Sequence, residues 1–472
     1  MTECNQSSFE FATHFQRQVV ASFDGGTISS ESGSLLLREV EQRTGIVRRF
    51  AACFRDYRDP EKIEHTVEEL IAQRVYGITL GYEDLNDHEQ LRQDPVLAVL
   101  CGKKDVEGRQ RRREQDRGKP GAGKSTLNRL ELTPADANEE ARYKKIVMDE
   151  AAVDRLLVDL YIQSQPRPPQ EVVLDLDVTD DPIHGNQEGR FFHAYYGDYC
   201  YLPLYIFIGN QLLCARLRSS NIDGAAGAVE EVARIVEQLR GTWPAVDVIV
   251  RADSGFCREP LMSWCEQHRV DYVLGLAKNR RLRKKLRAAM KQARQRYRES
   301  GHAARVFSEF NYCTRKSWSR GRRVIGKAEY MEKGENPRFV VTSLPATYLE
   351  ARSLYEDFYC ARGEVENRIK EQQLGLFADR TSTAKMRSNQ LRLYFSSIAY
   401  CLLEALRRLG LKDSEMAEAQ CSTIRLRLLK IGAQIRVSVR RICISMAAGH
   451  PGAAVFEHAW RNLQAIPLPA TA

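Results

Sequence analysis

The chain has 472 residues, of which 43% are hydrophobic and 28% charged, and its formal net charge is +9. This composition is typical of a soluble globular protein with two or three domains. No apolar run reaches the roughly 18–20 residues of a membrane helix, and the N-terminus lacks the basic and apolar regions of a secretory signal. The twelve cysteines are scattered, without a C-x-x-C pair, which argues against a disulfide framework or structural zinc. We therefore expect a cytoplasmic protein.

The first third of the chain is predicted to be mostly helical. Apolar residues recur at helical spacing from Ile63 to Val75, and glycines follow at 77 and 81. Residues 102–134 are rich in Gly, Arg and Lys, which favours a linker. A second helix is expected at 137–164, followed by a proline-marked boundary at 165–170.

A Walker A pattern lies in the linker, from Gly118 to Lys124 and Ser125. Its phosphate-binding mechanism requires a hydrophobic strand immediately before the glycines. The charged residues that precede it cannot form a buried strand. We interpret the segment as a flexible basic loop, with a P-loop protein that uses Lys124 as the alternative.

From residue 171 the hydrophobic period changes to that of strands. Residues 171–178 predict a strand, 201–218 a hairpin, and the segments up to 276 a helix, a strand, a helix and a strand. Three strands followed by helix–strand–helix–strand predict an α/β core with a mixed sheet, the pattern of a ribonuclease-H-like fold.

Acidic residues stand at the ends of two of these strands. The alternation in VVLDLDV places Asp175 and Asp177 on one face and apolar residues on the other. A carboxylate in an apolar strand is costly unless it is paired or binds a metal. Asp253 follows the strand VDVIVRA, where α/β active sites collect. An ion pair for Asp175 or Asp177 and a helix cap for Asp253 are the structural alternatives.

Two basic runs without acidic residues follow. Residues 278–298 contain eleven Lys and Arg, and residues 311–327 contain six, with Tyr312 and Trp318 among them. Either run alone is typical of a solvated helix face. Together they favour a nucleic-acid backbone and its bases as the partner.

The third acid, Glu366, lies in a predicted helix. Tyr359, Arg362, Glu366 and Lys370 are spaced 3, 4 and 4 residues apart, which places them on one stripe of a regular helix. Cations one turn away on either side keep the carboxylate ionised, as a metal ligand beside a phosphate requires. The alternative is a surface ladder of ion pairs. The three acids together predict a two-metal site acting on nucleic acid.

Blocks along most of the chain resemble a known family. They lie at 22–45, 82–95, 125–131, 174–189, 251–256 and in the Glu366 helix. In combination they are similar to the group 1 DDE transposases of bacterial insertion sequences, in the family numbered thirteen-eighty. The resemblance implies a ribonuclease-H-like core, two Mg²⁺ ions that Mn²⁺ can replace, and Asp177, Asp253 and Glu366 as their ligands, with Asp175 as the alternative first ligand.

The resemblance also implies DNA contacts. Related transposases carry a Y-(2)-R-(3)-E-(6)-K pattern, which Tyr359, Arg362 and Glu366 match. The lysine position is Gln373 here, and Lys370 is expected to substitute. The other expected DNA-binding residues are Trp318, by analogy with a base-stacking tryptophan, and Arg280, Arg281, Lys284, Lys285, Arg322 and Arg323 of the basic runs.

We therefore expect a DNA transposase that binds terminal inverted repeats, cleaves at them and joins the 3′-OH ends to target DNA as at least a dimer. A metal-dependent nuclease without strand transfer is the alternative. The expected organisation is an N-terminal, mostly helical DNA-binding region with a basic linker (1–134), the first part of the core (135–303), an inserted β-subdomain (304–345), the catalytic helix and the rest of the core (346–410), and a helical C-terminal region (411–472).

Overall fold

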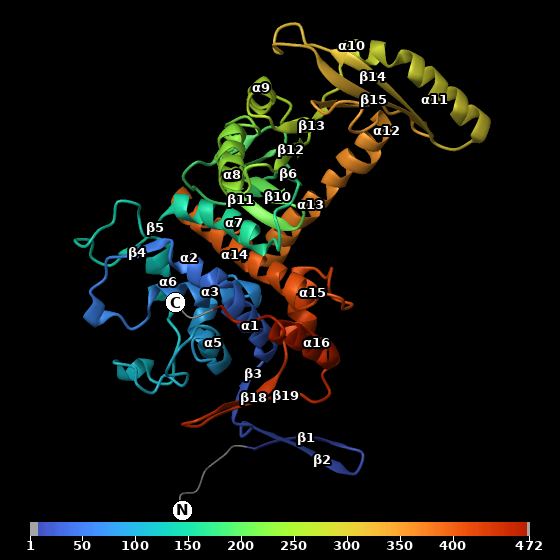
Figure 1. Ribbon diagram of the computed structural model, residues 1–472. Helices are drawn as coiled ribbons and strands as arrows, with labels where there is room; N and C mark the ends of the chain where they lie inside the picture. Colours follow the sequence, from blue (N-terminus) through green and yellow to red (C-terminus); the bar gives the residue numbers. More distant parts are fainter. Residues whose placement is uncertain (1–7, 470–472) are drawn as a thin grey trace, which may run out of the picture. The chain divides into compact units, whose positions relative to one another are not determined.

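The computed structural model describes residues 8–469 and divides into two compact units (Figure 1). Unit 1 comprises Met1–Met148, Gly375–Phe377 and Ile398–Ala472, and unit 2 comprises Asp149–Leu374 and Ala378–Ser397. The N-terminal and C-terminal regions that the sequence separates thus belong mainly to one unit. Among the described residues, no helix has the length and apolarity needed to cross a membrane.

Unit 2 is built on a large mixed sheet. Its strands follow the order β11-β10-β6-β12-β13-β17-β15-β14, and β16 pairs with β15. Strand β10 is antiparallel to both of its neighbours, β11 and β6, whereas β6, β12 and β13 are parallel. The bounds are β6 Glu171–Val178, β10 Leu204–Ile208, β11 Gln211–Arg216, β12 Asp247–Ala252, β13 Asp271–Leu276, β14 Ala304–Tyr312, β15 Arg322–Met331, β16 Gly334–Glu335 and β17 Arg338–Thr342.

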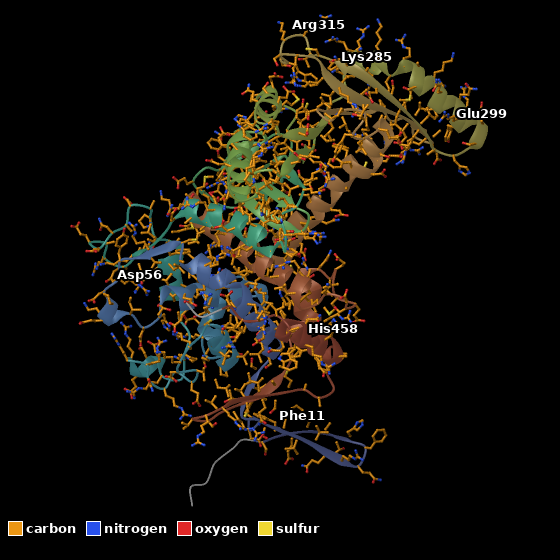
Figure 2. All side chains as sticks on the ribbon, in the orientation of Figure 1. Phe11, Asp56, Lys285, Glu299, Arg315 and His458 are labelled. Atoms are coloured by element: carbon orange, nitrogen blue, oxygen red, sulfur yellow. The ribbon has the colours of Figure 1, made fainter. Side chains whose placement is uncertain are left out.

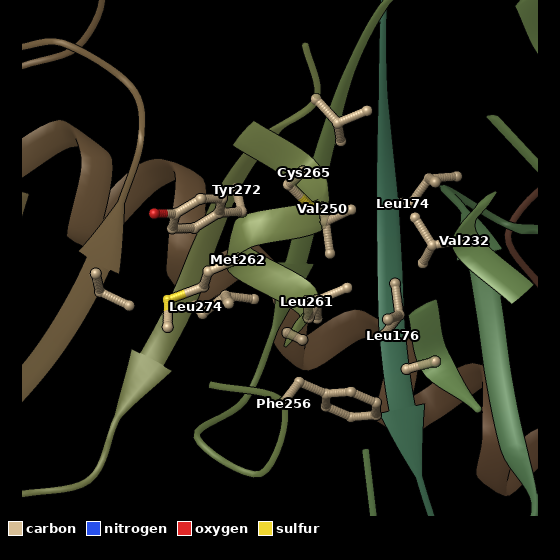
Figure 3. Packing of buried hydrophobic residues seen from close by; sticks show 14 of the residues in the cluster. Leu174, Leu176, Val232, Val250, Phe256, Leu261, Met262, Cys265, Tyr272 and Leu274 are labelled. Carbon is tan, nitrogen blue, oxygen red and sulfur yellow. The ribbon is translucent and has the colours of Figure 1, made fainter. Parts of the chain in front are cut away.

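Helices connect the parallel strands, as parallel pairing requires. Helix α8 (Ala228–Thr242) joins β11 to β12, and α9 (Glu259–Gln267) joins β12 to β13; α7 (Glu150–Ser164) precedes β6. Leu174 and Leu176 of β6 point into the apolar core with residues of β12, β13, α8 and α9 (Figure 3). The predicted alternation is therefore confirmed, and it leaves the opposite face of β6 to the aspartates.

The segment predicted as an inserted β-subdomain extends the main sheet. Strand β17 pairs with β13, and β15 and β14 follow outward. Helices α10 (Arg280–Lys285) and α11 (Arg287–Ser300) precede β14, and α11 packs against β14 and β15 (Figure 1). The helices bury Leu282, Leu286, Ala289, Met290 and Ala293 and expose their cations.

A small antiparallel sheet that the sequence did not predict follows β6. It consists of β7 (Asp181–Pro182), β9 (Asp198–Tyr201) and β8 (Phe191–His193), in the order β7-β9-β8. Its strands are too short for a detectable period.

The Glu366 segment is helical, but it is not one regular α-helix. It runs through α12 (Ala351–Ser353), a π-helical stretch (Leu354–Tyr359), a 3-10 turn (Cys360–Arg362), α13 (Gly363–Lys370) and a second π-helical stretch (Glu371–Gly375). Each change of period rotates the following side chains. The predicted stripe is therefore broken at Tyr359, whereas Arg362 and Glu366 keep the predicted i,i+4 contact. Helix α14 (Met386–Leu409) follows.

Unit 1 combines helices with short strands. The helix predicted at 137–164 begins only at Glu150, in unit 2, where Asp149 caps it by accepting from Ala152 N (3.0 Å). The C-terminal region contains strands as well as helices. Bounds are β1 Ser8–His14, β2 Arg17–Ser22, β3 Thr27–Ser29, β4 Phe54–Asp56, β5 Ile146–Met148, β18 Ala433–Val437, β19 Ile442–Met446, α1 Leu35–Thr44, α2 Ile46–Ala51, α3 Val67–Thr79, α4 His88–Leu91, α5 Pro95–Leu100, α6 Lys124–Glu131, α15 Cys421–Ile424 and α16 Ala453–Gln464.

Candidate active site and nucleic-acid interface

Asp175 on β6 is held in an ion pair within the sheet. In the parallel pairing of β6 with β12 it stands opposite Arg251. Arg251 Nε donates to Asp175 Oδ1 (2.6 Å) and Nη2 donates to Oδ2 (2.8 Å). Burial raises the pKa of Asp175, and the Arg251 guanidinium opposes that shift. Both carboxylate oxygens of Asp175 are thus engaged by one arginine, as the ion-pair alternative predicts for this residue; Asp177 also has an arginine partner, Arg362.

Asp177, two residues further along the same face, meets different neighbours. Its Oδ1 accepts from Val178 N (2.9 Å), and its Oδ2 accepts from Arg362 Nη1 (3.2 Å). Burial raises the pKa of Asp177 to about 6; Arg362 opposes the rise, whereas the charges of Asp253 and Glu366 add to it. The three carboxylates predicted from the sequence therefore lie within electrostatic reach of one another.

Asp253 follows the last residue of β12. Its Oδ1 accepts from Gly255 N (2.8 Å), which closes a tight turn at the strand end. The N-cap of α9 is Arg258, so the structure excludes the alternative in which Asp253 caps that helix. The side chain is partly buried at the carboxyl end of the parallel strands.

Glu366 lies on α13, and its side chain is 49% exposed. Arg362 Nη2 donates to Glu366 Oε1 (3.0 Å), so one guanidinium bridges Asp177 and Glu366. Burial alone would lower the pKa of Arg362, but the charges of Asp177 and Glu366 reverse that effect and the pKa is raised. Lys370, the last residue of α13, is exposed.

Tyr359 approaches the Asp253 turn through a gap left by Gly275 of β13. A Cβ atom on Gly275 would lie 2.5 Å from the Tyr359 hydroxyl oxygen, 2.8 Å from Ser254 N and 3.1 Å from the Asp253 carbonyl carbon. A glycine inside a strand often marks such a close approach. The glycine in the strand DYVLGL is the signal in the sequence that could have indicated this close approach.

The acids offer suitable ligands for Mg²⁺, although they are not arranged as a metal cluster. Carboxylate oxygens are the ligands that Mg²⁺ and Mn²⁺ prefer. Within residues 8–469, no three His, Cys, Asp or Glu side chains are grouped closely enough to hold an ion. The Arg362 guanidinium stands between Asp177 and Glu366. The donor chemistry therefore fits, and in the free protein the Arg362 guanidinium engages one oxygen of Asp177 and one of Glu366.

Gln373 occupies the position of the family's lysine. Its Nε2 donates to the carbonyl oxygen of Asp180 (2.9 Å), just beyond the end of β6. The amide thus ties the second π-helical stretch to the strand that carries Asp177.

The basic run at 278–298 lines an open groove of about 990 Å³. Cations recur at helical spacing along its wall. The lining residues are Lys278, Asn279, Arg280, Arg283, Lys284, Leu286, Arg287, Met290, Lys291, Arg294, Glu335 and Pro337.

The predicted DNA contacts of α10 divide between two faces. Arg280 and Lys284 line the groove, whereas Arg281 and Lys285 do not. The Arg281 guanidinium lies 5.2 Å from the ring centre of Tyr312, and the Lys285 ammonium lies 5.1 Å from that of Phe310. Figure 2 labels Lys285 in this region. Arg281 and Lys285 thus contact β14, and their cations are partly engaged there.

The remaining predicted contacts are occupied inside the protein. Arg322 is buried; its Nη1 donates to Glu259 (2.6 Å) and its Nε to Glu266 (2.7 Å), both on α9. Arg323 Nη1 donates to the carbonyl of Leu344 (2.8 Å). Arg322 therefore forms ion pairs inside the protein, with Glu259 and Glu266.

Trp318 is buried as well, with 9% of its surface exposed. Its ring packs against Tyr312 at 5.7 Å between centres in an edge-to-face arrangement. A base could stack on this indole only after the surrounding loop moved.

The Walker-like segment is an ordered turn instead of a flexible loop. Ala122 is buried and exchanges two hydrogen bonds with the Gln73 side chain, both 2.8 Å. A 3-10 turn (Glu114–Asp116) precedes it where a P-loop needs a strand. Lys124 N donates to Glu89, and its ammonium donates to Asn86. This geometry does not support the P-loop alternative.

Comparison with known proteins identifies the family. Residues 11–468 match the model described as "Transposase DDE domain group 1". Among solved structures, a piggyBac transposase synaptic complex with hairpin DNA, determined by cryo-EM, is similar with 11% identity and a TM-score of 0.38, over 84% of this chain and 79% of that one. A search of curated proteins found no match. Because the family model spans nearly the whole sequence, the chain belongs to the group 1 family of DDE transposases.

Proposed function

We propose that this DNA transposase cleaves DNA at the terminal inverted repeats of a bacterial insertion sequence of the thirteen-eighty family and joins the 3′-OH ends to target DNA. The observation that carries the proposal is that the Arg362 guanidinium bridges Asp177 (3.2 Å) and Glu366 (3.0 Å), with Asp253 near enough for its charge to act on Asp177. The strand order β11-β10-β6-β12-β13, with three antiparallel strands followed by parallel ones, supports a ribonuclease-H-like core.

Asp177, Asp253 and Glu366 would hold the divalent ions. Two such ions activate the attacking oxygen and stabilise the leaving oxygen in phosphodiester chemistry. Arg362 holds Asp177 and Glu366 near each other in the free protein. The Arg362 guanidinium would also bind a phosphate of the DNA, through two parallel hydrogen bonds.

The remaining residues position the acids. Arg251 neutralises Asp175, so that Asp177 is the carboxylate on this face that remains for the site. Tyr359 packs at the Asp253 turn, where its hydroxyl can orient the DNA backbone. The groove cations of α10 and α11 bind phosphates farther along the duplex. Joining two ends to one target implies at least a dimer in the active complex.

The test uses DNA that carries the repeats flanking the coding sequence, a supercoiled target and Mg²⁺. Wild-type protein is expected to nick at the repeat ends and to form joined products. Asp253→Ala is expected to bind the same ends without cutting them. Cutting without joining would favour a nuclease, and full activity of Asp253→Ala would refute the assignment of the acids.

A further inference from the structure

The hairpin formed by β8 and β9 exposes a group of aromatic side chains. The exposed fractions are 56% for Phe192, 85% for Tyr195 and 41% for Tyr199. Phe192 stands opposite Tyr199 in the strand pairing, and their rings meet edge to face at 5.5 Å. Rings of this size usually supply core packing energy, so their exposure on one short hairpin needs an explanation.

The hairpin is anchored directly beyond the proposed catalytic strand. Strand β7 begins at Asp181, four residues after Asp177, and pairs with β9 through Asp181 and Tyr201. Ile183 N also donates to the carbonyl of Tyr199 (2.8 Å). Burial raises the pKa of Tyr196, and the charges of Asp180 and Asp177 raise it further. The hairpin is thus close to the acids by topology and by electrostatics.

The backbone beneath the rings is well supported. Ser220 Oγ donates to the carbonyl of Phe191 (2.8 Å), and Tyr201 bridges to Ser219. Gly197, with φ of +74°, closes the turn by donating to the carbonyl of His193 (2.8 Å). Such a platform presents its rings at low entropic cost, because each ring has only two side-chain torsions to fix.

A cation completes the surface. The Arg190 guanidinium lies 4.0 Å from the ring centre of Tyr199. Aromatic rings interleaved with arginine are what single-stranded nucleic acid requires, since the rings stack on bases and the cation attracts the backbone. Trp318, the ring for which this task was predicted, is buried.

We propose that Phe192, Tyr195 and Tyr199 form a stacking platform for unpaired bases of the DNA strand next to the scissile phosphate. The inference rests on the proposed function, because it takes the acids as the cleavage site. Stacking on these rings would hold the separated strand in place while Asp177 faces the phosphate, and it would tolerate any base, because every base has a flat face.

The test compares two duplexes of one repeat end, one fully paired and one with unpaired bases at the cleavage point. Binding is measured in full-length Asp253→Ala protein, so that the DNA stays intact. Adding Tyr195→Ala is expected to weaken binding of the unpaired duplex about tenfold and to change the paired duplex little. Tyr195→Phe keeps the ring and is expected to bind as the parent does. Trp460→Ala removes a half-exposed ring of α16 and serves as the matched control.

Salt dependence separates stacking from charge. Loss of a ring is expected to leave the slope of log affinity against log salt unchanged, because no phosphate contact is removed. The proposal is overturned if Tyr195→Ala binds both duplexes as the parent does, or if it changes the sedimentation of the free protein, which would mark the hairpin as a self-association surface. Ring-dependent binding with no end cleavage by the wild type would leave the platform standing and refute the proposed function.

Discussion

Asp175 and Asp177 show how neighbours decide the role of a residue. They share one face of β6, and the pattern VVLDLDV cannot rank them. The structure separates them because Arg251 lies opposite Asp175 in the adjacent strand, whereas Asp177 meets Arg362 from α13's N-terminal side. The first has both oxygens held by Arg251, whereas the second shares Arg362 with Glu366 and lies near the charge of Asp253.

The two aspartates should therefore respond differently to neutralisation. Asp175→Asn is expected to lower the free energy of unfolding by about 3 kcal/mol, because it removes the charged partner of the partly buried Arg251. Asp177→Asn is expected not to lower the free energy of unfolding above pH 6. An acid whose pKa is raised to about 6 in the folded protein favours the folded state only while it is protonated.

Urea unfolding at several pH values measures both effects. The stability of the wild type relative to Asp177→Asn should fall as the pH rises from about 4 to 6, the window between the ordinary and raised pKa values of that carboxyl. Equal losses in the two variants would contradict the division of roles.

At the scale of elements, β13 and the Glu366 segment fit together through one missing side chain. Gly275→Ala would place a methyl group against the Tyr359 hydroxyl and the backbone of the Asp253 turn. We expect a loss of about 1–3 kcal/mol in stability and a drop in end cleavage, with partial recovery of stability in Gly275→Ala/Tyr359→Phe.

Thermal unfolding and the rate of end cleavage test this prediction. Gly241→Ala in α8 is the matched control, since nothing lies within 4 Å of its added Cβ, and it is expected to be neutral or slightly stabilising. A Gly275→Ala protein with wild-type stability and cleavage would show that the close approach does not constrain the site.

Helices α10 and α11 carry the second prediction at this scale. Lys291→Ala is expected to weaken DNA binding for paired and unpaired duplexes alike and to reduce the salt slope by about 0.9, the value for one phosphate contact. Arg296→Ala is the control, because Arg296 is exposed on α11 outside the groove. Equal effects of the two substitutions would mean that DNA does not bind preferentially to the groove face of α11.

At the scale of the molecule, sequence patterns predict those helices and strands whose hydrophobic residues recur at a regular spacing. Strands β6, β10, β11, β12 and β13 and helices α8 and α9 follow from alternation and helical spacing, and the acids at the strand ends follow from them. The buried states of Arg322 and Trp318 could not be predicted in this way. They depend on partners such as Glu259, which lies 63 residues away from Arg322 in the chain.

The positions at which the helical geometry changes could not be predicted from the sequence either. The stripe from Tyr359 to Lys370 assumed one regular helix, whereas π-helical and 3-10 turns interrupt the segment. The β7–β9 sheet was missed because strands of two to four residues show no clear alternation.

The Walker-like turn yields a prediction for the whole protein. Lys124→Ala is expected to leave end cleavage within about twofold of the wild type, with or without ATP, because the turn is a packed element without the strand that a P-loop needs. Cleavage assays with both proteins measure this. Loss of cleavage in a folded Lys124→Ala protein would instead indicate that this turn binds a nucleotide.

The central claim, that three acids distant in the sequence share one metal site, is tested most directly by replacing Mg²⁺ with Fe²⁺ and mapping the backbone cuts made by the hydroxyl radicals that the bound iron generates. We predict cuts near Asp177, Asp253 and Glu366 together, suppressed by excess Mg²⁺ and lost in Asp253→Ala. Cuts at one of these positions alone, or cuts that persist in Asp253→Ala, would contradict it.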